Sequence, residues 1–175
     1  MLSGKVFLDS YIKRSLYYKE LGDKTFDQLN ETDFHYQLNE ENNSIAVIIQ
    51  HLAGNMKSRF TNFLTEDGEK EWRKRDAEFE EKNLTKVELL QIWNDGWICY
   101  LDAVKRLNED DLFKTITIRT EKLSVIDALN RQMAHYPYHV GQIVYIGKMI
   151  KKEQWKSLSI PKGKSDEFNR GMNHK

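Results

Sequence analysis

The chain has few of the residues that interrupt helices or cross-link small proteins. Its 175 residues include two prolines, nine glycines and one cysteine, Cys99. Scarce proline and glycine favour long helices over many short strands. A single cysteine excludes an intramolecular disulfide framework and is typical of a reducing compartment. Signal-peptide patterns and apolar runs of membrane-spanning length are also missing. We therefore expect a cytoplasmic protein that does not associate with a membrane.

The chain also lacks an excess of charge of either sign. Lysine plus arginine number 27, and aspartate plus glutamate also number 27. No net field would draw the protein towards nucleic acid, so we expect no nucleic-acid partner. The length fits one domain with its own apolar core. We predict a single domain over residues 1–175, in which residues 152–175 form a C-terminal tail packed on the rest through Trp155 and Ile160.

Apolar residues recur at helical spacing in four parts of the sequence. The periodicity predicts helices over roughly 5–22, 44–64, 85–107 and 124–151. The first helix is expected to end near Gly22. Capping signals open the other three, at Asn43 or Ser44, at Thr85 with Glu88, and at Ser124 with Asp127. Residues 115–123 predict a short hairpin or an extended connector before the last helix.

A dense run of charge separates the second and third predicted helices. Residues 65–83 are too many for a tight turn between antiparallel neighbours, so they predict a long crossover. Four helices with one long crossover indicate an all-α fold, a four-helix bundle. Trp72 and Phe79 lie within the charged run, and we interpret it as a solvated loop held by two aromatic anchors rather than as a binding surface.

Histidines lie on the inward faces of two predicted helices. His135 and His139 are four residues apart and therefore share one helix face. His51 occupies a buried face of the second helix, and bundles commonly build metal sites from side chains on facing helices. The three rings are either ligands of one metal ion or core histidines satisfied by hydrogen bonds, because a pair at this spacing is by itself a weak motif. From the residues alone, three imidazoles suit zinc, nickel, copper and iron alike.

The residues between the paired histidines argue against one familiar zinc chemistry. Zinc proteases with this spacing carry a glutamate directly after the first histidine as general base, and here that position is Tyr136. Protein hydrolysis is therefore disfavoured. Pro137 lacks an amide proton and is predicted to kink the helix while leaving the two histidines on one face.

Two segments resemble a known group of proteins. His51-Leu52-Ala53-Gly54-Asn55, followed far downstream by His135-x-x-Tyr138-His139-Val140-Gly141-Gln142-Ile143, resembles the DinB-like (YfiT-like) superfamily of bacterial four-helix-bundle proteins. The tail from Trp155 to Asn169 is similar to that of an uncharacterised subgroup within it. The resemblance implies an up-down-down-up topology and homodimers. It also implies a divalent metal, zinc or nickel, held by His51, His135 and His139.

The resemblance also suggests a chemistry. Characterised members include transferases and isomerases that use low-molecular-weight thiols such as bacillithiol, mycothiol or glutathione. Our hypothesis is a metal-dependent S-transferase that activates such a thiol for transfer to an electrophilic small molecule, with Asn55, Tyr138 and Gln142 lining the pocket. The alternatives are a metal-dependent hydrolase of a small molecule and a metal-stabilised binding protein without turnover.

Overall fold

Helices make up most of the chain. The computed structural model describes residues 4–172, so the outermost residues of the predicted domain and tail, 1–3 and 173–175, lie outside the described range. The main helices are α1 (Gly4–Phe26), α2 (Ile45–Phe60), α3 (Lys86–Lys105), α4 (Val125–Lys151) and the short α5 (Ser165–Met172). Two strands, β1 (Thr115–Ile118) and β2 (Glu121–Ser124), pair antiparallel.

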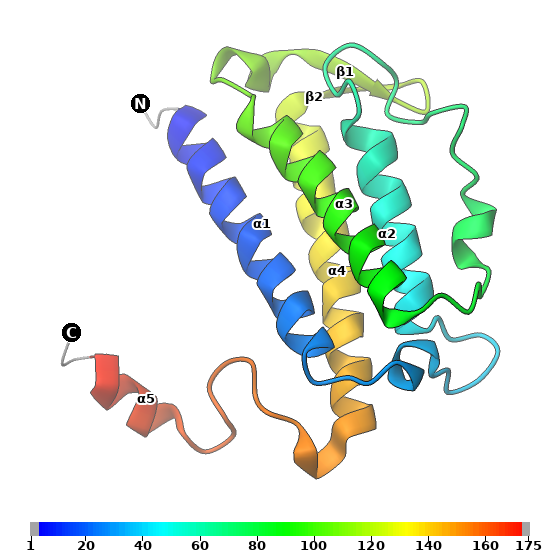
Figure 1. The fold of residues 1–175 in the computed structure, drawn as a ribbon. Helices are drawn as coiled ribbons and strands as arrows, with labels where there is room; N and C mark the ends of the chain where they lie inside the picture. The colour runs from blue at the N-terminus through cyan, green and yellow to red at the C-terminus, as the bar shows by residue number, and fades with distance from the viewer. Residues whose placement is uncertain (1–3, 173–175) are drawn as a thin grey trace.

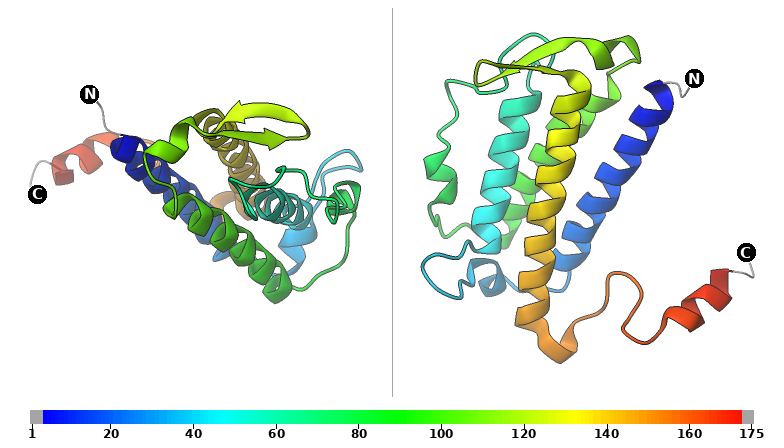
Figure 2. Two further views of the ribbon diagram at one scale, coloured as in Figure 1. Left: turned by 90° about the horizontal axis from the view of Figure 1, so that it is seen from above. Right: turned by 180° about the vertical axis from the view of Figure 1, so that it is seen from behind.

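The four long helices lie side by side around a common core (Figures 1 and 2). α2 packs mainly against α3, and α1 packs mainly against α4. In Figure 1, α1 and α4 run downwards while α2 and α3 run upwards. Because α2 and α3 run in the same direction, the chain between them must return along the length of the helices. Residues 61–85, which we call the crossover segment, make that return beside α2.

The helix starts follow the capping signals in the sequence. The Thr85–Glu88 capping box is present, with both of its reciprocal hydrogen bonds. Ser44 and Ser124 each accept a hydrogen bond from a backbone amide in the first turn of α2 and α4. The predicted starts of these three helices are therefore confirmed to within a residue or two.

The end of the first helix differs from the prediction. α1 continues past Gly22 to Phe26. Gly22 is buried under Trp93, and a Cβ atom at this position would lie 2.5 Å from Cζ2 of that indole. Gly22 therefore permits close packing of two helices, whereas the sequence pattern alone suggested a helix terminator.

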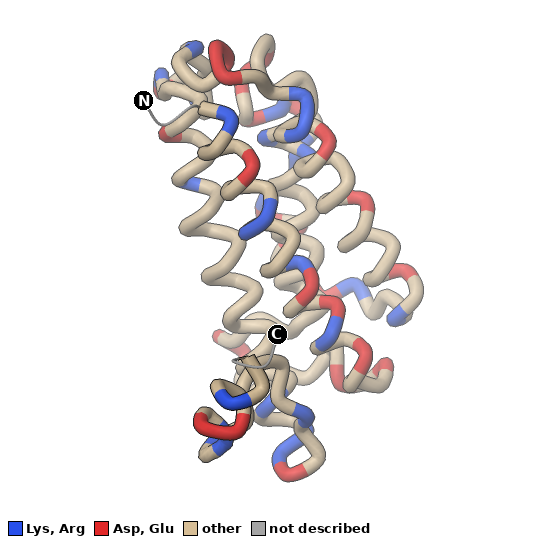
Figure 3. Tube along the Cα trace, turned by 90° about the vertical axis from the view of Figure 1, so that its left-hand side faces the viewer, with Lys and Arg blue, Asp and Glu red and all other residues tan. Residues whose placement is uncertain are grey.

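Large aromatic side chains of α3 and α4 fill the core. Trp93, Trp97 and Tyr100 of α3 are almost completely buried, as is Tyr136 of α4. The first five residues of α2, Ile45–Ile49, are all buried, which confirms the prediction that this apolar stretch is covered on several sides. Among the described residues no helix is both long enough and apolar enough to cross a membrane. The side shown in Figure 3 carries acidic and basic residues interspersed.

The predicted hairpin is present, and it is tied to the crossover segment. Its turn is formed by Arg119 and Thr120, whose φ angles are +53° and +66°. The Asp67 carboxylate accepts hydrogen bonds from the amides of both turn residues, and the Gly68 amide donates to the carbonyl of Thr117 at 2.8 Å. These bonds fix the turn beside the end of α2.

Only the beginning of the tail contacts the helices. Trp155 is half-buried near Gly147, and Lys156 exchanges hydrogen bonds with Gln28. Ile160 is exposed, and α5 contains no buried residue. From Ile160 to α5 the chain leads away from the bundle (Figures 1 and 2). The predicted packing of the tail is thus limited to the region of Trp155.

Candidate metal centre

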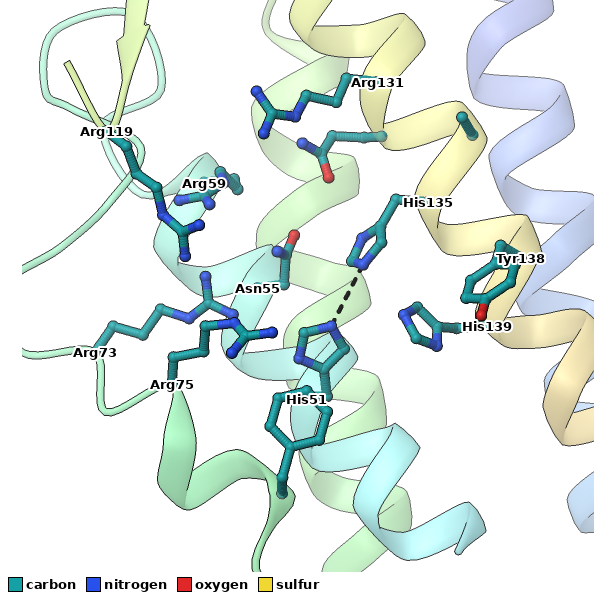
Figure 4. A pocket seen from close by; sticks show the side chains of 13 residues that line it. His51, Asn55, Arg59, Arg73, Arg75, Arg119, Arg131, His135, Tyr138 and His139 are labelled. Atoms are coloured by element: carbon teal, nitrogen blue, oxygen red, sulfur yellow. Dashed lines mark hydrogen bonds between the residues drawn. The ribbon is translucent and has the colours of Figure 1, made fainter. Parts of the chain in front are cut away.

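Polar residues repeat every four positions on the facing sides of α2 and α4. The repeat on α2 is His51, Asn55 and Arg59, and the repeat on α4 is Arg131, His135 and His139. Residues at this spacing lie on one helix face. Because the two helices run in opposite directions, the histidines of α2 and α4 face each other at one level of the site. Arg59 and Arg131 both lie at the other level (Figure 4).

The three predicted histidines converge. Nε2 of His51 lies 3.3 Å from Nε2 of His135. The ring of His139 has its centroid 5.0 Å from that of His51 and 4.7 Å from that of His135. One ring nitrogen from each residue falls within 4.8 Å of the others. α4 continues through Pro137, and both of its histidines share one face.

Glu78 of the crossover segment orients His51. Its carboxylate lies 3.0 Å from Nδ1 of His51, which therefore carries the proton and leaves Nε2 free as a ligand atom. Arg73 holds Glu78 in turn through two hydrogen bonds of 2.7 and 2.8 Å. Burial opposes ionisation of Glu78, yet the hydrogen bonds from Arg73 and His51 keep its pKa below the usual carboxyl value. The ring of Phe79 stacks beside His51 at 4.7 Å between centroids.

Gly54 provides the space that this carboxylate occupies. A Cβ atom on Gly54 would lie 2.2 Å from Oε1 and 2.7 Å from Cδ of Glu78. Arg73 and His51 hold the carboxylate from its other sides, so it has little freedom to move. The glycine three residues after His51 therefore allows a second chain segment to reach the histidine.

Gln142 performs the corresponding role for His139. Its Oε1 lies 2.8 Å from Nδ1 of His139, which assigns the ring proton to Nδ1 and leaves Nε2 free. Burial lowers the pKa of His139, although the hydrogen bond to Gln142 opposes this effect. Burial also lowers the pKa of His135 to about 3, assisted by the charges of the neighbouring histidines and of Arg73. Both rings are therefore neutral near pH 7.

The donor set fits a divalent metal ion. At zinc–nitrogen distances of about 2.1 Å, two nitrogens of a tetrahedral site are about 3.4 Å apart. The 3.3 Å between the Nε2 atoms of His51 and His135 is close to that value. Each of His51 and His139 has its other nitrogen bonded to a side-chain oxygen, the outer-shell arrangement typical of metal-bound histidine. Three histidine ligands would leave a tetrahedral ion with an open position, as in catalytic zinc sites.

The cluster lines a cavity of about 590 Å³. This volume lies within the range of small-molecule sites. Asn55 lines the cavity, and its Oδ1 accepts a hydrogen bond from the buried hydroxyl of Tyr136 at 3.1 Å. Tyr138 is exposed at the rim, whereas Gln142 lies behind His139 and is not among the lining residues. The other lining side chains are Arg59, Arg73, Arg75, Phe79, Arg119, Arg131, Gln132, Ala134 and the three histidines.

The crossover segment contributes more to the site than its sequence suggested. The sequence predicts a solvated loop with Trp72 and Phe79 as anchors. In the structure Trp72 is exposed and does not anchor the loop, whereas Phe79 packs on His51. The segment also supplies Glu78 and two arginines of the cavity wall. Most of the segment is irregular, and the 3-10 helix Asp76–Phe79 is a single turn, so neither has a periodicity from which side-chain directions can be read. Arg59 and Arg131 did carry a signal, because each continues the four-residue spacing of the histidines.

Comparison with known proteins gives one match. A family model described as "Protein of unknown function (DUF1572)" matches residues 3–164. A search of curated proteins finds no significant match.

Proposed function

The chain belongs to the DUF1572 family, and we propose that it binds a divalent metal ion, zinc or nickel, through His51, His135 and His139. We propose further that it activates a low-molecular-weight thiol for transfer to an electrophilic small molecule. The observation that carries the proposal is the convergence of three imidazole nitrogens within 4.8 Å at the wall of a cavity.

The resemblance to the DinB-like superfamily supports this proposal. Its members combine an up-down-down-up bundle with three histidines at matching positions, and the helix directions in Figure 1 agree with such a topology. When bound, a divalent cation with three imidazole ligands supplies an open position at which a thiol or a water loses its proton near neutral pH. In the transfer, the thiol sulfur bonds to the electrophilic carbon, the leaving group departs with its bonding electrons, and the thiol proton passes to solvent.

The residues of the chain would divide the remaining tasks. Glu78 and Gln142 fix the orientation of two imidazoles, so little rearrangement is needed to hold an ion. Asn55, with its oxygen bonded to Tyr136, presents its amide nitrogen as a donor to a ligand. The cavity reaches the histidines, which favours turnover over a purely structural metal.

Metal analysis of purified protein tests the ligand assignment. We expect a single ion per chain in the wild type and loss of the metal in His51→Ala and His139→Ala. His35→Ala is the matched control, because His35 is bonded to Glu81 and to the carbonyl of Leu84, outside the cluster. Undiminished metal in both cluster variants would refute the site.

Turnover is tested with the metal-loaded protein. A chromogenic aryl halide is mixed with bacillithiol, mycothiol or glutathione, and release of the halide is compared before and after chelation. We expect acceleration that depends on both the metal and one of the thiols. Metal-dependent cleavage of a nitrophenyl ester without any thiol would instead support the hydrolase, and no acceleration in either assay would support a binding protein.

A further inference from the structure

Five arginines line the same cavity as the histidines. Arg59 comes from α2, Arg73 and Arg75 from the crossover segment, Arg119 from the hairpin turn and Arg131 from α4. We call them the arginine cluster, and Figure 4 shows them around one side of the site. No acidic side chain is among the described residues that line the cavity. A zero net charge overall makes this local concentration of positive charge a property of the site rather than of the chain.

Two members of the arginine cluster are buried and held in place. Arg59 donates hydrogen bonds to Glu69 and to the carbonyl of Gly68, and Arg73 binds Glu78 in a bidentate manner. One nitrogen of Arg73 is left over: Nη1 is buried without a hydrogen-bond partner, and its nearest carboxylate oxygen, on Glu69, is 3.7 Å away. Buried charged donors normally have partners. Arg73 therefore keeps an unused donor at the cavity wall.

The other three members of the arginine cluster are accessible to solvent and form fewer contacts with the protein. The side chains of Arg75, Arg119 and Arg131 are 49 %, 52 % and 46 % exposed. Each pairs with one carboxylate: Asp76 at 3.7 Å, Glu69 at 2.9 Å and Glu121 at 3.0 Å, respectively. The pairs of Arg75 and Arg131 are exposed on both sides; such pairs contribute little to stability, so a ligand can replace them at small cost.

A buried acceptor lies on the α4 side of the same cavity. Oε1 of Gln132 is buried and has no hydrogen-bond partner. Gln132 follows Arg131 in the chain, and both line the cavity. An acceptor and an excess of donors on the two sides of one space together suit a ligand with both an anionic group and a donor group.

We infer that the cavity binds a small molecule carrying a carboxylate or phosphate group, which the arginine cluster holds while the other end of the molecule faces the histidines. Arginine is suited to both anions because its planar fork donates two hydrogen bonds at once. The cavity volume fits a small molecule, and the arginines line one cavity instead of following a surface as they would for a nucleic-acid backbone. The inference rests on the proposed function only for the placement of the reacting end.

Anion binding can be measured without turnover. Wild-type protein, as purified and after chelation, is titrated calorimetrically with succinate, with inorganic phosphate and with uncharged succinamide. We expect succinate or phosphate to bind both forms and succinamide to bind neither. Equal binding of succinate and succinamide, or tighter binding of a single-stranded oligonucleotide than of phosphate, would overturn the inference.

Matched variants locate the anion. In the double variant Arg75→Gln/Arg131→Gln we expect binding to weaken by at least roughly tenfold, because two charged donors are lost. Arg14→Gln, an exposed arginine on α1, is the control and should bind as the wild type does. Both substituted arginines are accessible, and thermal melting checks that the variant is folded. Unchanged anion binding in the folded double variant would refute the role of the arginine cluster.

One further variant separates the two proposals. His139→Ala should lose the metal and keep anion binding. Metal retention by the wild type without anion binding would refute only the present inference. Anion binding by a wild-type protein that takes up no metal ion under any condition would refute only the proposed function.

Discussion

The two ends of the cavity are built on different principles. At the histidine end, the rings of His51 and His139 are oriented by hydrogen bonds to Glu78 and Gln142. At the arginine end, charged side chains form ion pairs with carboxylates, and three of the five arginines are about half exposed to solvent. Ligands in fixed orientations suit an ion that must be held in one geometry. A set of exchangeable ion pairs suits a ligand that enters and leaves.

Glu78 belongs to both ends, so its removal should have the largest effect. Glu78→Ala leaves Arg73 buried without its bidentate partner and His51 without its acceptor. Loss of one partner of a buried ion pair costs about 3–5 kcal/mol. We expect a decrease of that size in the free energy of unfolding, measured by urea denaturation, together with weaker metal binding. Glu80→Ala, exposed and two residues further along, should change stability by less than about 0.5 kcal/mol. Equal stability of the two variants would contradict the arrangement described.

Gly54→Ala should weaken metal binding at the histidine end. The new methyl group would displace the Glu78 carboxylate and loosen His51 while leaving all three metal ligands in the chain. Removing an outer-shell partner typically costs roughly 10- to 100-fold in metal affinity, and we expect a loss in that range from competition with a chromogenic chelator. Gly141→Ala is the control, since a Cβ atom there meets nothing within 4 Å. An unchanged affinity in Gly54→Ala would show that Glu78 does not orient His51.

Glu121→Gln should affect the arginine end alone, and only slightly. The substitution frees Arg131 from its exposed partner. Exposed ion pairs contribute about 0.2–1 kcal/mol, so succinate should bind roughly twofold more tightly, as measured by calorimetry. Glu20→Gln, which removes the exposed pair with Lys24 on α1, should leave succinate binding unchanged. Weaker succinate binding in Glu121→Gln would indicate that Glu121 belongs to the binding surface.

The same contrast explains how far sequence alone could predict the molecule. The helices and their starts followed from apolar periodicity and from local caps such as Thr85 with Glu88. The convergence of the three histidines could be predicted because each lies on a regular helix whose inward face is visible in the apolar periodicity. The predicted end of α1 was wrong because Gly22 is there to accommodate the Trp93 indole, a contact distant in sequence. Arg73 lies in irregular chain and Glu78 in a single 3-10 turn, where spacing does not give the direction of a side chain, so only coordinates could place them.

The crossover segment forms one wall of the cavity beside the helices that carry the histidines. α2 and α4 carry the three imidazoles, whereas the crossover segment provides Arg73, Arg75 and Phe79 on one side of the cavity. Rebuilding this stretch would therefore be a direct route to a bundle that accepts a different compound. Such a redesign would have to keep an acidic side chain able to reach His51 over Gly54.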